Sequence, residues 1–100
     1  MNLSTMDADK KLVPVDVVMD LRSQLTNGKE QADQGQYALA RRIFGSAITS
    51  VDGALAKFSG AESLRSIRAE LDSASRRALR ACQAENDLTR KRGGTAVPCE

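Results

Sequence analysis

Histidine is absent from this chain of 100 residues, and aromatic side chains are scarce, with only Tyr37, Phe44 and Phe58 present. Without histidine, the chain lacks both the most common general base and the most common metal ligand of proteins. Its two cysteines, Cys82 and Cys99, cannot complete a zinc site by themselves. No general base accompanies the serines, so a nucleophilic serine is not expected. We therefore expect no metal, no cofactor, no small-molecule substrate and no catalytic activity in this chain.

A long apolar run is also missing. The sequence contains no stretch of 18 consecutive apolar residues, whereas a membrane-spanning helix needs about 20. Residues 1–12 are polar and lack the apolar core of a secretory signal. We therefore expect no membrane insertion and, for a complete chain, a cytoplasmic location. If the chain is a domain of a larger, membrane-anchored protein, an extracytoplasmic location is the alternative.

Neither sign of charge is in large excess, since 15 basic and 13 acidic residues give a net charge of +2. Such a balance does not indicate a nucleic-acid-binding protein. Of the 41% of residues that are hydrophobic, 14 are alanines, which pack helices closely but bury little area. At about 25 cal/mol per Å² of apolar surface, a core of this kind leaves only a few kcal/mol of net stability. We therefore expect the domain to self-associate or to dock onto another protein.

Apolar residues recur every three or four positions in three consecutive segments, as they do on one face of an α-helix. The segments cover residues 15–34, 36–57 and 61–92. Because the connections between them are short, neighbouring helices must run antiparallel. The pattern predicts an all-α fold, a three-helix up-down-up antiparallel bundle with a long third helix. No segment has the alternation of a strand.

The glycines and the first residues of the chain set the predicted boundaries. We expect a disordered segment at 1–13, a helical domain at 14–92, and a flexible or disulfide-tethered tail at 93–100. Gly28 is expected inside the first helix, where another helix approaches closely; the alternative is a turn at Asn27-Gly28. Ser59 and Glu62 have the spacing of a capping box at the start of the third helix.

Small and aromatic residues between positions 21 and 54 recur at the offsets of a 34-residue repeat. The six matching residues are Gly28, Gly35, Tyr37, Ala40, Phe44 and Ala47. At these positions the segment resembles a tetratricopeptide repeat, a hairpin of two helices. Gln24, Asn27 and Asp52 depart from the family, which prefers tryptophan, leucine and proline there. The resemblance implies one such hairpin followed by a capping helix, and not a stacked array.

Tetratricopeptide domains bind partner proteins along the face of each first helix, and the resemblance implies the same for the matching positions here. Those positions are Arg22, Leu25, Lys29, Ala32 and Asp33. Members that bind chaperone tails carry a lysine and asparagine clamp, where this chain has Leu25 and Lys29. Protein binding is therefore implied, but not that particular activity.

A second resemblance concerns the end of the chain. The stretch from Ala81 to Asn86, the basic segment after it, and Pro98-Cys99-Glu100 are similar to the carboxy-terminal ends of some bacterial serine/threonine protein kinases that carry helical-repeat regions. No catalytic motif of a kinase is present. This resemblance therefore implies only an accessory domain of a larger signalling protein.

Cys82 and Cys99 are separated by 17 positions, and a disulfide between them would fold the tail back along the third helix. The nine helical residues from Cys82 to Lys91 rise about 14 Å. Eight further residues can span about 26 Å, so the return is sterically possible. The alternative is a half-buried helix cysteine and a free tail cysteine, and spacing alone does not decide between them.

Two basic clusters lie on the third helix and at its end. They consist of Arg76, Arg77 and Arg80, and of Arg90, Lys91 and Arg92. They could contact phosphate, nucleic acid or an acidic partner, or they could form a solvated face whose last cations favour the negative end of the helix dipole. No aromatic residue lies among them to stack on a base. We therefore predict a non-catalytic protein-interaction or scaffold module, with a small nucleic-acid-associated helical protein as the alternative.

Overall fold

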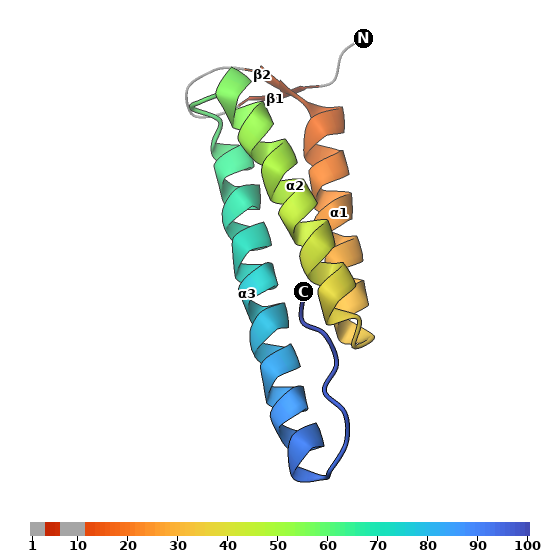
Figure 1. The fold of residues 1–100 in the computed structure, drawn as a ribbon. Coiled ribbons are helices and arrows are strands. Elements are labelled where there is room, and N and C mark those ends of the chain that lie inside the picture. Colours follow the sequence, from red (N-terminus) through yellow and green to blue (C-terminus); the bar gives the residue numbers. More distant parts are fainter. Residues whose placement is uncertain (1–3, 7–11) are drawn as a thin grey trace.

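The protein folds as three helices, shown as a ribbon in Figure 1. This computed structural model describes residues 4–6 and 12–100. Its elements are β1 (Ser4–Met6), β2 (Leu12–Pro14), α1 (Val15–Asp33), α2 (Tyr37–Lys57) and α3 (Glu62–Lys91). Each helix runs antiparallel to the next, so α1 and α3 point the same way. The predicted all-α, up-down-up bundle is confirmed, and each predicted helix boundary is within one residue of the observed one.

The expectation that the chain contains no strand is wrong. β1 and β2 pair antiparallel, with Thr5 opposite Val13, at the end of the bundle where α1 begins (Figure 1). Val13 is fully buried and belongs to the core. Strands of three residues are too short to show a recognisable alternation, which is why the pattern did not reveal them. The remainder of the segment predicted to be disordered, residues 1–3 and 7–11, lies outside the described residues.

The helix α1 continues through Gly28, so the predicted continuous helix is confirmed and the alternative turn at Asn27-Gly28 is wrong. Gly28 is buried, and a Cβ atom added to it would lie 2.8 Å from the Phe44 ring carbon Cδ1. The glycine therefore lets the Phe44 ring pack directly on the backbone of α1. The sequence predicted that another helix approaches closely at Gly28, and in the structure that helix is α2.

Glycines in the left-handed conformation end two of the helices. Gly35 has φ of 79° and Gly93 has φ of 78°. After α1, the Gly35 N–H donates to Ala32 O at 3.0 Å and the Gln36 N–H to Gln31 O at 2.9 Å, which is the Schellman pattern. The same pattern follows α3, where the Gly94 N–H donates to Thr89 O at 2.9 Å. These turns reverse the chain tightly at both places.

The predicted capping box at the start of α3 is wrong. The N-cap is Ala61 and not Ser59, and no side chain caps this helix end. Instead, the Ala61 N–H donates to Phe58 O at 2.9 Å in a tight turn, and Ala61 is fully buried. The burial of Ala61 in the core therefore outweighs the preference of Ser59 for the N-cap position.

The apolar core side chains that α3 contributes decrease in size from Leu64 to Ala78. Near the strands, the buried residues of α3 are Leu64, Ile67 and Leu71, whereas farther along they are Ala74 and Ala78. The helix α3 has 30 residues and α2 has 21, so α3 extends past the α1–α2 hairpin (Figure 1). The helix α3 therefore contributes large core side chains near the strands and small ones farther along, beside Phe44 of α2, where the candidate site lies.

Candidate partner-binding groove

A groove runs between α1 and α3 along the alanine-rich half of the bundle. It consists of two adjoining hollows of about 480 and 330 Å³. Lys29 of α1 and Ala74 and Arg77 of α3 line both hollows, which makes them continuous. We call this feature the α1–α3 groove.

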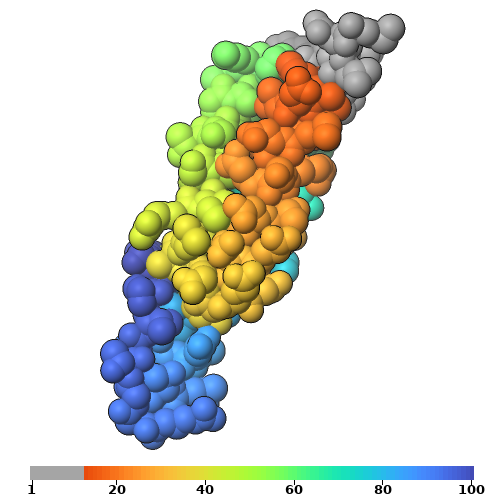
Figure 2. Space-filling model, turned by 90° about the vertical axis from the view of Figure 1, so that its right-hand side faces the viewer, coloured from red at the N-terminus to blue at the C-terminus, as the bar shows by residue number. Residues whose placement is uncertain are grey.

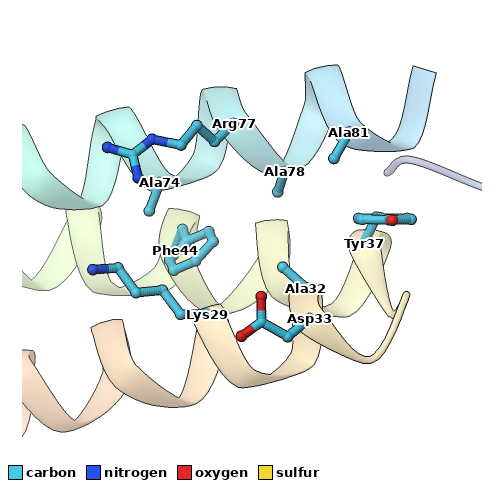
Figure 3. A pocket seen from close by; sticks show the side chains of 9 residues that line it. All are labelled: Lys29, Ala32, Asp33, Tyr37, Phe44, Ala74, Arg77, Ala78 and Ala81. Carbon is cyan, nitrogen blue, oxygen red and sulfur yellow. The ribbon is translucent and has the colours of Figure 1, made fainter. Parts of the chain in front are cut away.

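Alanines make up four of the nine residues that line the larger hollow. Ala32 lies on the α1 wall and Ala78 and Ala81 lie on the α3 wall, while Phe44 of α2 lies between them (Figure 3). Ala74 and Ala78 are buried against the core, whereas Ala81 is exposed. Short side chains of this kind leave room for the backbone of another helix to approach closely.

Charged groups sit on the rims of the groove. Lys29 and Arg77 face each other from opposite walls near the same end of the larger hollow, and Asp33 lies farther along α1 toward Tyr37 (Figure 3). All three are exposed. Arg77 donates a long hydrogen bond of 3.5 Å to the Ser73 hydroxyl of its own helix. The groove therefore offers two cations at its centre and one carboxylate a helical turn away.

Tyr37 closes one end of the groove. Its hydroxyl donates a hydrogen bond of 2.6 Å to Glu85 Oε2 of α3, which links the start of α2 to the part of α3 beyond the hairpin. This hydrogen bond to a carboxylate, together with burial and the negative charge of Glu85, raises the pKa of Tyr37 above its ordinary value. The tyrosine thus links the α1–α2 hairpin to the third helix.

Titration of Tyr37 provides a direct test of this link, because it is the only tyrosine of the chain. We expect ultraviolet absorbance to give a pKa above 10.0 in the folded protein and a return toward that value in Glu85→Ala. Because the folded pKa is raised, the hydrogen bond stabilises the fold fully below the unfolded pKa and is lost as the pH rises through the folded pKa. Glu70→Ala, which removes another carboxylate of α3, should leave the Tyr37 titration unchanged. Identical titrations of wild type and Glu85→Ala would contradict the contact.

The opposite end of the groove is bounded by an ion pair. Arg22 of α1 lies 3.6 Å from Glu70 of α3, both partly exposed, and Glu70 also lines the smaller hollow. Exposed pairs of this kind add only about 0–1 kcal/mol of stability. Arg22 nevertheless neutralises the charge of Glu70, so Glu70 does not cancel the positive charge of Lys29 and Arg77.

The five α1 residues predicted to bind a partner do not form one surface. Leu25 is 6% exposed and belongs to the core, so it is not available to a partner. Arg22 pairs with Glu70 outside the larger hollow. Lys29, Ala32 and Asp33 line the α1–α3 groove. The opposite wall could not be predicted from the sequence, because only the tertiary fold brings Ala78 and Arg77 of α3 beside them.

The tail folds back along α3, and a disulfide joins Cys82 to Cys99 with their Cα atoms 5.8 Å apart. The alternative of two free cysteines is therefore not what the structure contains. The buried amide of Asn86 accepts from the Val97 N–H at 2.8 Å and donates to Val97 O at 2.9 Å. Asn86 was not recognised from the sequence, because a single asparagine in a polar helix carries no periodic signal.

The end of the tail reaches the first turns of α2, where Glu100 forms an ion pair with Arg41. Arg41 also donates to the Ser75 hydroxyl of α3 at 3.3 Å. In the space-filling view, the tail lies beside the last turns of α3 and next to the start of α2 (Figure 2). The tail therefore covers the side of α3 that faces α2 and leaves the α1–α3 groove open.

The six residues of the two predicted basic clusters do not form one continuous patch. Arg76 pairs with Asp72 at 2.7 Å and Arg90 with Asp87 at 3.8 Å. Fourteen helical residues separate Arg76 from Arg90, a rise of about 21 Å. Arg80, Lys91 and Arg92 are exposed, and Arg77 lines the groove. Only Arg77 is therefore placed in the candidate site.

Two further findings concern only the described ranges, 4–6 and 12–100. They contain no group of three or more histidine, cysteine, aspartate or glutamate residues arranged to hold a metal ion. Within the same ranges, no helix combines the length and the apolar character needed to cross a membrane.

Comparisons of the chain with protein-family models, with curated proteins and with solved structures give no match. The resemblances to a tetratricopeptide repeat and to kinase carboxy-terminal regions therefore remain predictions that depend on the residues quoted for them. The α1–α3 groove, described from its own side chains, is the basis for assigning a function.

Proposed function

We propose that this domain is a non-catalytic protein-interaction module that binds a helical segment of a partner protein in the α1–α3 groove. The observation that supports this proposal is the combination of small side chains on both walls with charged residues on the rims. Small walls admit a helix closely, and rim charges select and orient it. The tetratricopeptide resemblance supports the same function, since it also points to the exposed face of the first helix.

A helix is the occupant that suits this geometry. Two parallel neighbours, α1 and α3, leave a channel whose natural complement is a fourth helix running antiparallel to both, as in a four-helix bundle. The groove extends along α3 from Ser66 to Ala81, which corresponds to about 22 Å of helix. A helix of about four turns would therefore fill it.

The setting we propose is an accessory domain of a larger, bacterial signalling protein, acting in an oxidising compartment. The Cys82–Cys99 disulfide supports this location, since disulfides persist outside the reducing cytosol. The similarity of the tail to the carboxy-terminal ends of some bacterial serine/threonine protein kinases is compatible with an accessory role in a larger signalling protein. The tail then acts as a structural element of the domain and not as a linker.

A library of displayed helical peptides of about 16 residues tests the proposed function. We expect the oxidised protein to select binders, and Ala81→Trp to reduce their affinity at least about tenfold, because the indole would occupy the groove. Ala84→Trp is the matched control, since Ala84 is also exposed on α3 but is not among the residues that line the groove. Binders that are lost in Ala84→Trp and retained in Ala81→Trp would exclude the groove as the binding site.

A further inference from the structure

We infer that the partner helix presents a carboxylate between Lys29 and Arg77 and, one helical turn away, a basic side chain opposite Asp33. This inference rests on the proposed function and specifies the chemistry of the partner. It depends on the order of charges along the groove, which is negative at Asp33, positive at the centre, and neutralised at the Arg22–Glu70 end.

The two central cations have no carboxylate of their own. Within the described part of the chain, neither Lys29 nor Arg77 forms an ion pair, while the neighbouring Arg22, Arg68 and Arg76 each do. Both cations line both hollows and reach them from opposite walls (Figure 3). A carboxylate placed between them would accept hydrogen bonds from both walls at once, and such charge-assisted bonds are stronger than neutral ones.

The position of Asp33 relative to Lys29 determines the order of charges along the partner helix. Lys29 and Asp33 are four residues apart on α1 and therefore lie on the same face, about 6 Å from each other. A partner helix that contacts both side chains must carry an acidic residue opposite Lys29 and a basic residue opposite Asp33, at the same spacing of four residues. An antiparallel arrangement is favoured because the dipoles of α1 and α3 point the same way. A partner helix that runs antiparallel to α1 passes Asp33 before Lys29. Its basic residue therefore precedes its acidic residue by four positions.

The remainder of the groove restricts the size of the side chains between these charges. Ala32 and Ala81 line the two walls where the partner must pass. We therefore expect alanine, serine or glycine at the partner positions that face α1 and α3, and larger apolar residues only where the partner crosses the ring edge of Phe44. The recognised sequence is a base and an acid four residues apart on a face of small residues.

The peptide library tests this inference separately from the proposed function. Among peptides selected by the oxidised wild-type protein, we expect enrichment of lysine or arginine followed four positions later by glutamate or aspartate. Replacing that acid by its amide in a selected peptide should weaken binding about tenfold. The same library presented to Lys29→Glu/Arg77→Glu should be enriched in a base at that position instead. Because both side chains are exposed, the variant should keep the helical circular-dichroism spectrum of wild type.

Peptides that bind in the groove without charge preference would overturn the inference and leave the proposed function intact. Failure of the wild-type protein to select any peptide would overturn both. Concentration-dependent dimerisation that is abolished by Ala81→Trp, in place of peptide binding, would assign the groove to a second copy of this chain and overturn the stated partner chemistry. The amide substitution in the peptide requires no protein variant, so the inference can be tested even if charge reversal disturbs the fold.

Discussion

Phe44→Ala is expected to lower the free energy of unfolding by about 3–5 kcal/mol. Phe44 is 1% exposed, packs its ring on Gly28, and is among the largest fully buried side chains of the described core. Neighbouring core residues such as Ala40, Ala47 and Ala74 are too small to collapse into the space left by the ring. Since domains of this size typically unfold with about 5–15 kcal/mol, we expect much of the stability to be lost in urea denaturation followed by circular dichroism.

Leu39→Ala provides the matched control for Phe44→Ala. Leu39 lies in the same helix but is 42% exposed, so its truncation should cost less than about 1 kcal/mol. Both substitutions replace a large apolar side chain in α2 by alanine, so the difference between them isolates burial. Equal losses for the two variants would mean that the Phe44 ring does not occupy the core between α1 and α3.

Removing the disulfide is expected to have the second largest effect. A crosslink over 17 residues restricts the unfolded chain enough to contribute about 3 kcal/mol. We expect the Cys82→Ser/Cys99→Ser variant to lose about that amount in urea denaturation. Its tail amides should also exchange hydrogen faster, because the bonds of Asn86 to Val97 and the ion pair of Glu100 with Arg41 then hold the tail without the crosslink.

The wild-type protein under a thiol reductant should match the double serine variant. Agreement between the two would show that the loss comes from the crosslink and not from the substituted side chains. The Asn86→Ala variant separates the two contacts, because it removes the bonds to Val97 while the disulfide stays closed. A reduced protein with unchanged stability and unchanged protection of the tail would contradict the tethered arrangement.

The three helices could be predicted from the sequence because their signal is local. In α2, apolar residues from Ala40 to Val51 recur at helical spacing, and glycine at position 35 marks the break before it. The role of Gly28 was also predictable, since a glycine inside an apolar stripe indicates close helix contact. The strand pair and the Ala61 turn were missed, because in each a single buried residue, Val13 or Ala61, decides the local structure through contacts distant in sequence.

Only one wall of the candidate site could be predicted. Lys29, Ala32 and Asp33 follow from the tetratricopeptide resemblance, but nothing in the α1 sequence indicates which α3 residues face them. Arg76 and Arg77 are adjacent in the sequence, but in the fold Arg77 lines the groove whereas Arg76 pairs with Asp72. The spacing of Cys82 and Cys99 made a disulfide sterically possible but did not require it. The path of the tail depends also on Asn86, which bonds to Val97.

The most direct test of the central claim is a titration of the isotopically labelled, oxidised domain with a selected helical peptide, followed in ¹H–¹⁵N spectra. The α1–α3 groove predicts that the largest shifts occur at residues 29–33 of α1 and 66–81 of α3, with small changes in the tail at 95–100. Shifts concentrated on the tail-covered side of α3, or spread evenly over the three helices, would contradict the assignment of this groove as the binding surface.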